Sequence, residues 1–118
     1  YGLEVKFRSR VWPELTLDAA ATTHLYRIAQ EALTNAARHA GATQISIALN
    51  ARGRMVTLTV TDDGAGLQDE PGNGMGLRIM RYRAQMMGGE LDIAPAEPRG
   101  TRVTCRVAQR ETAAGAGR

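Results

Sequence analysis

The sequence is poor in cysteine, lysine and aromatic residues, and each shortage excludes a class of protein. Cys105 is the only cysteine, so the chain has no internal disulfide and no zinc site built from several cysteines. It alternates with Val103 and Val107, which is typical of a small buried residue in a strand rather than of a catalytic nucleophile. Lys6 is the only lysine, and this excludes the Gly-Lys-Ser/Thr phosphate loop. Aromatic residues make up only 4% of the chain, too few for a nucleic-acid stacking platform.

Long apolar runs are absent as well. No stretch could cross a membrane and no signal peptide is recognisable. The chain starts at Tyr1 rather than Met, so we expect a cytoplasmic domain cut from a longer protein, whose attachment to a membrane stays open. The net charge of +3 comes from scattered arginines, which predicts a solvated surface and no nucleic-acid partner. The length of 118 residues predicts one domain over residues 1–110 and a disordered Ala/Gly-rich tail over residues 111–118.

Hydrophobic periodicity predicts alternating strands and helices. One helix is expected up to residue 40, capped by Thr22 or Thr23 and ended by Gly41, and a second over residues 75–87. Strands are expected over residues 3–7, 44–50, 55–61, 90–93 and 101–107, with a hairpin turn at residues 52–54. This order predicts an α+β fold, a two-layer sandwich whose mixed, mostly antiparallel sheet carries the helices on one face.

The first predicted helix has a polar stripe beside its apolar face. Glu31, Asn35 and Arg38 fall on this stripe at helical spacing. A solvated helix face explains most such stripes. However, an Asn in mid-helix is mildly unfavourable, because its side chain competes for backbone hydrogen bonds, and its amide oxygen is a ligand that Mg²⁺ accepts. The stripe therefore leaves a solvated surface and a metal–nucleotide site both open.

Two glycine-rich segments follow. Residues 62–66 (DDGAG) end a predicted buried strand, where the glycines would let a flat ligand approach the backbone and Asp62 could accept a hydrogen bond from an exocyclic amine. Residues 72–77 (GNGMGL) precede the second helix, where free N–H groups and the helix dipole favour phosphate. The dinucleotide pattern is not met, because Leu77 stands where its third glycine belongs.

Taken in order, these segments resemble the histidine kinase ATPase family, which is grouped with gyrase, Hsp90 and MutL. Residues 31–40 (EALTNAARHA) resemble its N box, residues 62–66 its G1 box and residues 74–77 (GMGL) its G2 box. Gly100 and Thr101 resemble the glycine–threonine pair that starts its last strand. Residues 25–31 (LYRIAQE) and 80–84 (MRYRA) are similar to the subfamily of nitrate-sensor and DesK-type kinases. The resemblance covers about residues 20–107.

The resemblance implies the Bergerat α/β sandwich with a site for ATP and Mg²⁺. Asp62 would bind the adenine amino group, helped by Thr101 through a water molecule, and Asn35 would hold the metal. Glu31 would be either a general base, as in gyrase-like members, or a residue that orients Mg²⁺-bound water. The other nucleotide contacts implied by the resemblance are Gly64, Gly66, Gly74, Gly76 and Leu77, with Arg38 and His39 near the phosphates.

The function implied by the resemblance is that of a sensor histidine kinase catalytic domain. It would donate the γ-phosphate of ATP to a histidine on a separate dimerisation domain, with a response regulator downstream, and would be monomeric when isolated. Neither His24, at the predicted helix start, nor His39, inside the N box, is expected to be the acceptor. Two alternatives stay open, an anti-sigma-factor type serine kinase and a nucleotide-gated interaction module without chemistry.

The chain departs from the family pattern in two places. The phenylalanine box of many histidine kinases is missing, because Phe7, the only Phe, lies before the N box. Residues 67–73 alone separate the G1 and G2 boxes, which implies a short lid over the nucleotide. Both departures suit the nitrate-sensor and DesK-type subfamily.

Overall fold

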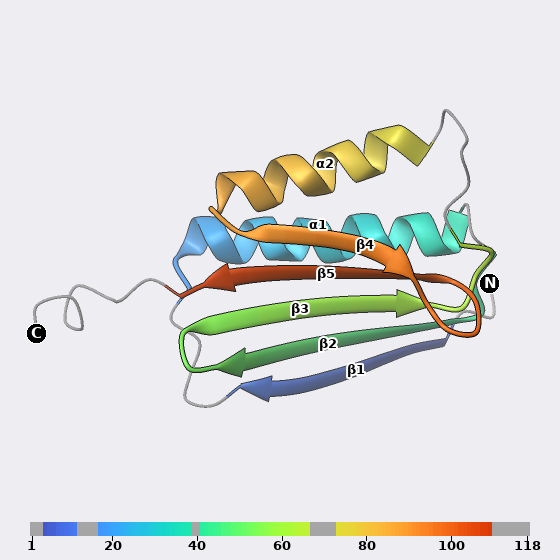
Figure 1. The fold of residues 1–118 in the computed structure, drawn as a ribbon, viewed down its shortest axis with the longest axis horizontal. Coiled ribbons are helices and arrows are strands. Elements are labelled where there is room, and N and C mark those ends of the chain that lie inside the picture. The colour runs from blue at the N-terminus through green and yellow to red at the C-terminus, as the bar shows by residue number, and fades with distance from the viewer. Residues whose placement is uncertain (1–3, 12–16, 39–40, 67–72, 110–118) are drawn as a thin grey trace, which may run out of the picture.

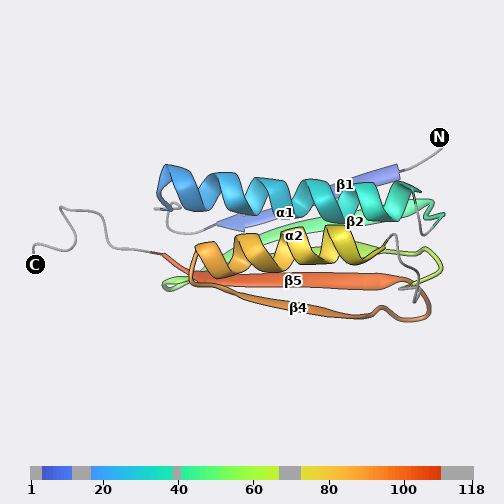
Figure 2. The ribbon, with the colours of Figure 1, turned by 90° about the horizontal axis from the view of Figure 1, so that it is seen from above.

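The computed structural model describes residues 4–11, 17–38, 41–66 and 73–109, which form two layers (Figure 1). One layer is a five-stranded sheet and the other is a pair of helices that lie side by side on one face of it (Figure 2). The elements in chain order are β1 (Glu4–Val11), α1 (Ala19–Arg38), β2 (Gln44–Arg52), β3 (Met55–Asp62), α2 (Asn73–Met86), β4 (Glu90–Pro95) and β5 (Thr101–Ala108). The predicted α+β sandwich is confirmed.

The strand order in the sheet is β1-β2-β3-β5-β4. Strand β1 pairs with β2 in parallel, and all other neighbours are antiparallel. The β2–β3 hairpin turns at Gly53, whose φ of 60° lies in the left-handed region that glycine adopts without strain. Because β3 ends and β5 begins at the same end of the sheet, the segments after Asp62 and before Thr101 lie close together.

The core lies between the sheet and the helices. Strand side chains alternate between the two faces of a sheet, and the apolar positions of β3 and β5 turn toward the helices. Cys105 is among the fully buried core residues, and burial raises the pKa of its thiol to about 11. The expectation of a small buried residue is therefore confirmed. The main inward residues are Ile28, Met80, Ala84, Val56, Leu58, Val60, Val103, Cys105 and Val107.

Two element boundaries differ from the prediction by three or more residues, and the starts or ends of β2, α2 and β4 differ by no more than two. Helix α1 begins at Ala19 because Asp18, and not Thr22 or Thr23, caps it: Asp18 Oδ1 accepts a hydrogen bond from the backbone N–H of Ala21 at 2.7 Å. The hydroxyl of Thr22 donates to the Asp18 carbonyl oxygen at 3.0 Å instead. Strand β1 continues to Val11 because its whole length pairs with β2, so the polar residues after Phe7 are held by ladder hydrogen bonds.

Neither described helix is both long enough and apolar enough to span a membrane. The predicted tail over residues 111–118 lies outside the described residues, as do His39 and most of the predicted lid, residues 67–72. The domain boundary at residue 110 stays a prediction.

Candidate nucleotide site

The segment after β3 is held in a tight turn by Asp62. Its Oδ1 accepts a hydrogen bond from the backbone N–H of Gly64 at 2.8 Å. The second carboxylate oxygen, Oδ2, has no hydrogen-bond partner among the described residues, and the Asp62 side chain is half-buried. One oxygen thus shapes the turn while the other can accept a hydrogen bond from a ligand.

The neighbouring Asp63 has a different task, which the sequence analysis did not predict. Its Oδ1 accepts hydrogen bonds from the backbone N–H groups of Thr43 and Gln44 at 2.8 and 2.9 Å, and its Oδ2 accepts one from the Thr43 hydroxyl at 2.8 Å. These donors, the Gln44 N–H first, lower the pKa of Asp63 from 3.8 to about 2. Asp63 therefore ties the glycine-rich loop to the start of β2.

Gly100 packs directly on this loop. Its φ is 112°, and a Cβ at this position would overlap the carbonyl oxygen of Asp62. Gly66, with φ 89°, lies near the Gly100 carbonyl oxygen, which a Cβ on Gly66 would meet at 3.5 Å. The β3–β5 register pairs Thr61 with Arg102, and this puts the buried Thr101 beside Asp62. The predicted G1 residues and the Gly100-Thr101 pair are thus brought together.

The predicted N box and G2 box also meet. Asn35 and Glu31, both half-buried, point from α1 at the first turns of α2, where a Cβ on Gly76 would lie 2.9 Å from Asn35 Oδ1 and 3.2 Å from Glu31 Oε2. Gly76 therefore leaves room for these two side chains. Gly74 lies in the first turn of α2, Leu77 follows it half-buried, and Arg38 is exposed at the end of α1.

Both groups of residues lie at one end of the molecule. Figure 1 shows the end of α1, the start of α2, the end of β3 and the start of β5 at the same side of the fold. This end therefore combines an aspartate at a strand end, an amide and a carboxylate on a helix, and the N-terminus of a second helix. Such a set can recognise an amine and a phosphate chain on one ligand.

The oxygen ligands at this end fit a metal that is shared with a phosphate ligand. Within the described residues there is no group of three or more His, Cys, Asp or Glu that could hold a metal ion. Asn35 and Glu31 together offer one or two hard oxygen ligands. Mg²⁺ is commonly bound in this way, with few protein ligands, several waters and substrate phosphates.

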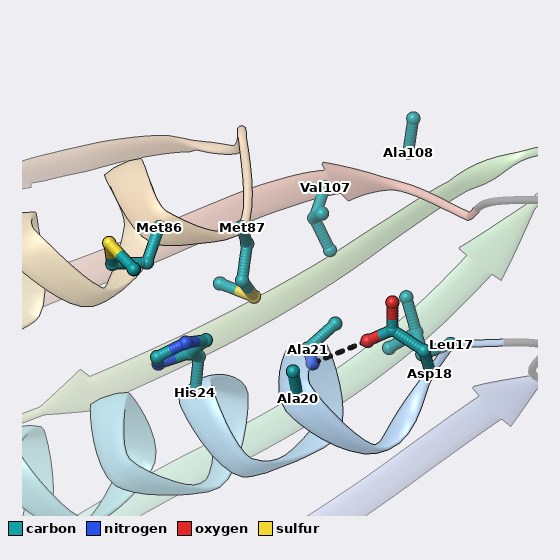
Figure 3. Close-up of a pocket in the computed structure, with 9 residues that line it drawn as sticks. All are labelled: Leu17, Asp18, Ala20, Ala21, His24, Met86, Met87, Val107 and Ala108. Atoms are coloured by element: carbon teal, nitrogen blue, oxygen red, sulfur yellow. Dashed lines mark hydrogen bonds between the residues drawn. The ribbon is translucent and has the colours of Figure 1, made fainter.

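A separate hollow of about 150 Å³ lies at the opposite end of the helices (Figure 3). His24 lines it together with Met86 and Met87, and the Nδ1 atom of His24 lies 3.2 Å from Nη1 of Arg83. His24 is eleven residues before Asn35 on α1, which corresponds to about 16 Å along the helix axis. This histidine therefore does not belong to the candidate nucleotide site.

Comparison with known proteins identifies the family. The family model described as histidine kinase-, DNA gyrase B-, and HSP90-like ATPase matches residues 20–111. The chain belongs to this ATPase family. The resemblance inferred from the N, G1 and G2 boxes is thereby confirmed, because the matched range contains all three.

Two curated relatives of this ATPase domain are named as sensors. The ATPase domain is 40% identical over 111 residues to the sensor histidine kinase MctS of Rhizobium johnstonii. The match covers 87% of this chain and 23% of the relative. The same domain is 38% identical over 95 residues to the nitrate/nitrite sensor protein NarQ of Escherichia coli, covering 78% of this chain and 17% of the relative. The ATPase domain thus spans less than a quarter of the length of either relative.

Solved structures share the fold of the ATPase domain. The blue-light activated histidine kinase of Erythrobacter litoralis EL346 superposes with a TM-score of 0.75 at 22% identity, covering 92% of this chain and 36% of that one. The ATP binding domain of PrrB from Mycobacterium tuberculosis gives a TM-score of 0.73 at 22% identity, covering 93% and 82%. The predicted two-layer sandwich is therefore that of histidine kinase ATPase domains.

Proposed function

We propose that this ATPase domain is the catalytic domain of a two-component sensor histidine kinase, which binds Mg·ATP and passes the γ-phosphoryl group to a histidine on another domain. The observation that carries the proposal is the packing of Gly76 against Asn35 and Glu31. It puts the first turns of α2, with their free N–H groups, beside an amide and a carboxylate, whose oxygens are of the kind that Mg²⁺ accepts. The kinship with a protein named as a sensor histidine kinase, and with one named as a nitrate/nitrite sensor protein, supports the same function.

Asp62 recognises the base in this proposal. Its Oδ2 accepts a hydrogen bond from the adenine amino group, while Oδ1 keeps its bond to Gly64. Thr101 assists through a water molecule. Gly66, which is half-buried, leaves its backbone open to a flat ring, and the buried Gly64 acts through its hydrogen bond to Asp62.

The phosphates and the metal occupy the helix end. Asn35 ligates Mg²⁺, and Glu31 either orients a water on the metal or acts as a general base. The backbone at Gly74, Gly76 and Leu77 surrounds the phosphates, which Arg38 and His39 also reach. ATP with Mg²⁺ supplies a γ-phosphoryl group and ADP as leaving group, and the protein contributes mainly position and charge.

The acceptor histidine lies on a dimerisation domain of the parent, and a response regulator receives the phosphoryl group afterwards. The domain itself is monomeric and works in the cytoplasm. The distance of His24 from Asn35, and its contact with Arg83, support an acceptor other than His24. In-line transfer requires the imidazole within about 3 Å of the phosphorus, which a side chain at the far end of α1 cannot reach.

The test is incubation with γ-labelled ATP, with and without the parent's helical segment added in trans. We expect acid-labile label on the added segment only, and no label when Asn35→Ala replaces the native chain. Acid-labile label on this chain alone would contradict the proposal. Acid-stable label on serine would favour the serine kinase, and binding without any transfer would favour the interaction module.

A further inference from the structure

Arg99 connects the turn between β4 and β5 to the glycine-rich loop after β3. Its Nε atom donates a hydrogen bond to the carbonyl oxygen of Gly64 at 2.9 Å. The turn that carries Arg99 is closed by a hydrogen bond from the Ala96 N–H to the Gly100 carbonyl oxygen at 3.0 Å. Arg99 is exposed as a whole whereas Gly64 is buried, so the guanidinium reaches inward from the surface to a backbone atom of the loop.

Both polar backbone groups of Gly64 are therefore held by hydrogen bonds. Its carbonyl oxygen accepts from Arg99, and its N–H donates to Asp62 Oδ1 at 2.8 Å. A glycine has no side chain to anchor its backbone and has more accessible conformations than other residues. The two hydrogen bonds thus link the orientation of the Asp62 carboxylate to the position of the Arg99 guanidinium.

We propose that Arg99 is a positioning residue for adenine recognition, which holds Gly64 so that Asp62 presents its free oxygen to the amino group of the base. The proposal rests on the base-binding role proposed for Asp62. Without the guanidinium, the Gly64 peptide can tilt, its N–H leaves Oδ1, and the carboxylate can rotate. Ligand binding must then restore the order that Arg99 maintains in the free protein, which weakens the hydrogen bond to the amine.

This role differs from simple attraction between a cation and the phosphates. Loss of attraction would weaken all nucleoside diphosphates by the same factor. Loss of positioning would weaken only those that carry the amino group. The experiment therefore compares ADP with purine riboside diphosphate, which differs from ADP by the absence of the 6-amino group.

Calorimetry should be run with both nucleotides on the native chain, Arg99→Ala, Arg99→Gln and Arg102→Ala. For Arg99→Ala we expect ADP affinity to fall about fivefold to tenfold, as for one lost hydrogen bond, with purine riboside diphosphate affinity unchanged. Arg99→Gln retains an N–H donor and should recover part of the loss. Arg102 is exposed on β5 and makes no hydrogen bond to the loop within the described residues, so Arg102→Ala controls for the lost charge.

The outcomes separate this inference from the proposed function. If the native chain binds both nucleotides equally, Asp62 does not recognise the amine. The base-binding role of Asp62 and the positioning role of Arg99 then both fail. If the native chain prefers ADP and Arg99→Ala keeps the same preference, the positioning role is wrong while the role of Asp62 stands. An equal loss of affinity for both nucleotides in Arg99→Ala would also contradict the positioning role. Should Arg99→Ala fail to fold by thermal melting, Arg99→Met, which keeps the length of the side chain without a donor, gives the same decision.

Discussion

The two ends of the helix pair use glycine for different purposes. At the end away from the candidate nucleotide site, called the far end below, Gly53 and Gly88 have φ values of 60° and 70°. There is open space where a Cβ would stand, so only the backbone conformation requires glycine at these positions. At the end that carries this site, called the near end below, two glycines leave room for other groups. Gly76 leaves room for the Asn35 and Glu31 side chains, and Gly100 leaves room for the Asp62 backbone. Gly76 and Gly100 therefore shape a site, whereas Gly53 and Gly88 shape turns.

Close packing alone does not distinguish the two ends. Gly89, after α2, also lies against backbone, and a Cβ there would be 2.6 Å from the Arg106 carbonyl oxygen. What separates the ends is the residues that the glycines meet. Arg106 belongs to an ordinary strand pair, whereas Asp62, Asn35 and Glu31 can each bind a ligand.

The largest effect should come from Gly100→Ala. The new Cβ would overlap the Asp62 carbonyl oxygen at a φ of 112°, so both the strand end and the loop must move. We expect a loss of about 3 kcal/mol or more in the free energy of unfolding, together with loss of ADP binding. Gly53→Ala, at φ 60° with free space, should cost about 1–2 kcal/mol and leave ADP affinity intact. Urea denaturation and calorimetry test both, and equal effects of the two substitutions on binding would contradict the comparison.

Gly76→Ala should separate binding from stability. Alanine favours a helix by about 1 kcal/mol over glycine, which offsets crowding against Asn35 Oδ1 at 2.9 Å. We therefore expect the melting temperature to change little while Mg·ATP affinity falls by about tenfold or more, because Asn35 and Glu31 are displaced. Native affinity in a folded Gly76→Ala variant would show that this contact does not matter for the ligand.

Asp63→Asn should change the acid stability of the fold. The pKa of Asp63 is about 2 in the folded chain against an ordinary 3.8. Its contribution to stability is therefore complete above pH 4 and is lost as the pH falls from about 4 toward 2. The stability difference between native and variant chains should shrink over this range in urea titrations. A difference that stays constant from pH 7 to pH 3 would disprove the anchoring role.

The smallest effect is expected at the far end. Asp18→Ala removes the cap of α1 and should lower the free energy of unfolding by about 1 kcal/mol. ADP affinity should stay within about twofold, because Asp18 lies at the other end of α1 from Asn35. Asp18→Asn retains the acceptor oxygen and should lose less stability. A marked loss of ADP binding in either variant would show that the two ends are coupled.

Local patterns predicted much of this molecule, and contacts distant in sequence explain what they missed. Alternation identified β2, β3 and β5, and the order of the N, G1 and G2 boxes identified the family. The task of Asp63 could not be predicted, since its partners Thr43 and Gln44 lie about twenty residues away. Arg99 is likewise 35 residues from Gly64. Only folding of the sheet brings such partners together.

The start of α1 was misassigned for a local reason. Asp18, Thr22 and Thr23 are all good capping residues, and the preference among them depends on where the chain enters the helix. The roles proposed for His39 and for residues 67–72 concern positions outside the described part of the chain, so they stay predictions.

The measurement that tests the central claim most directly is calorimetry of ADP binding to the native chain and to Asp62→Asn. The substitution keeps the size of the side chain but replaces one acceptor oxygen with a donor, which repels the adenine amino group. We predict binding to the native chain and a loss of affinity of about a hundredfold in the variant, with circular dichroism and melting temperature close to native. Equal ADP affinity in the two folded proteins would contradict the account.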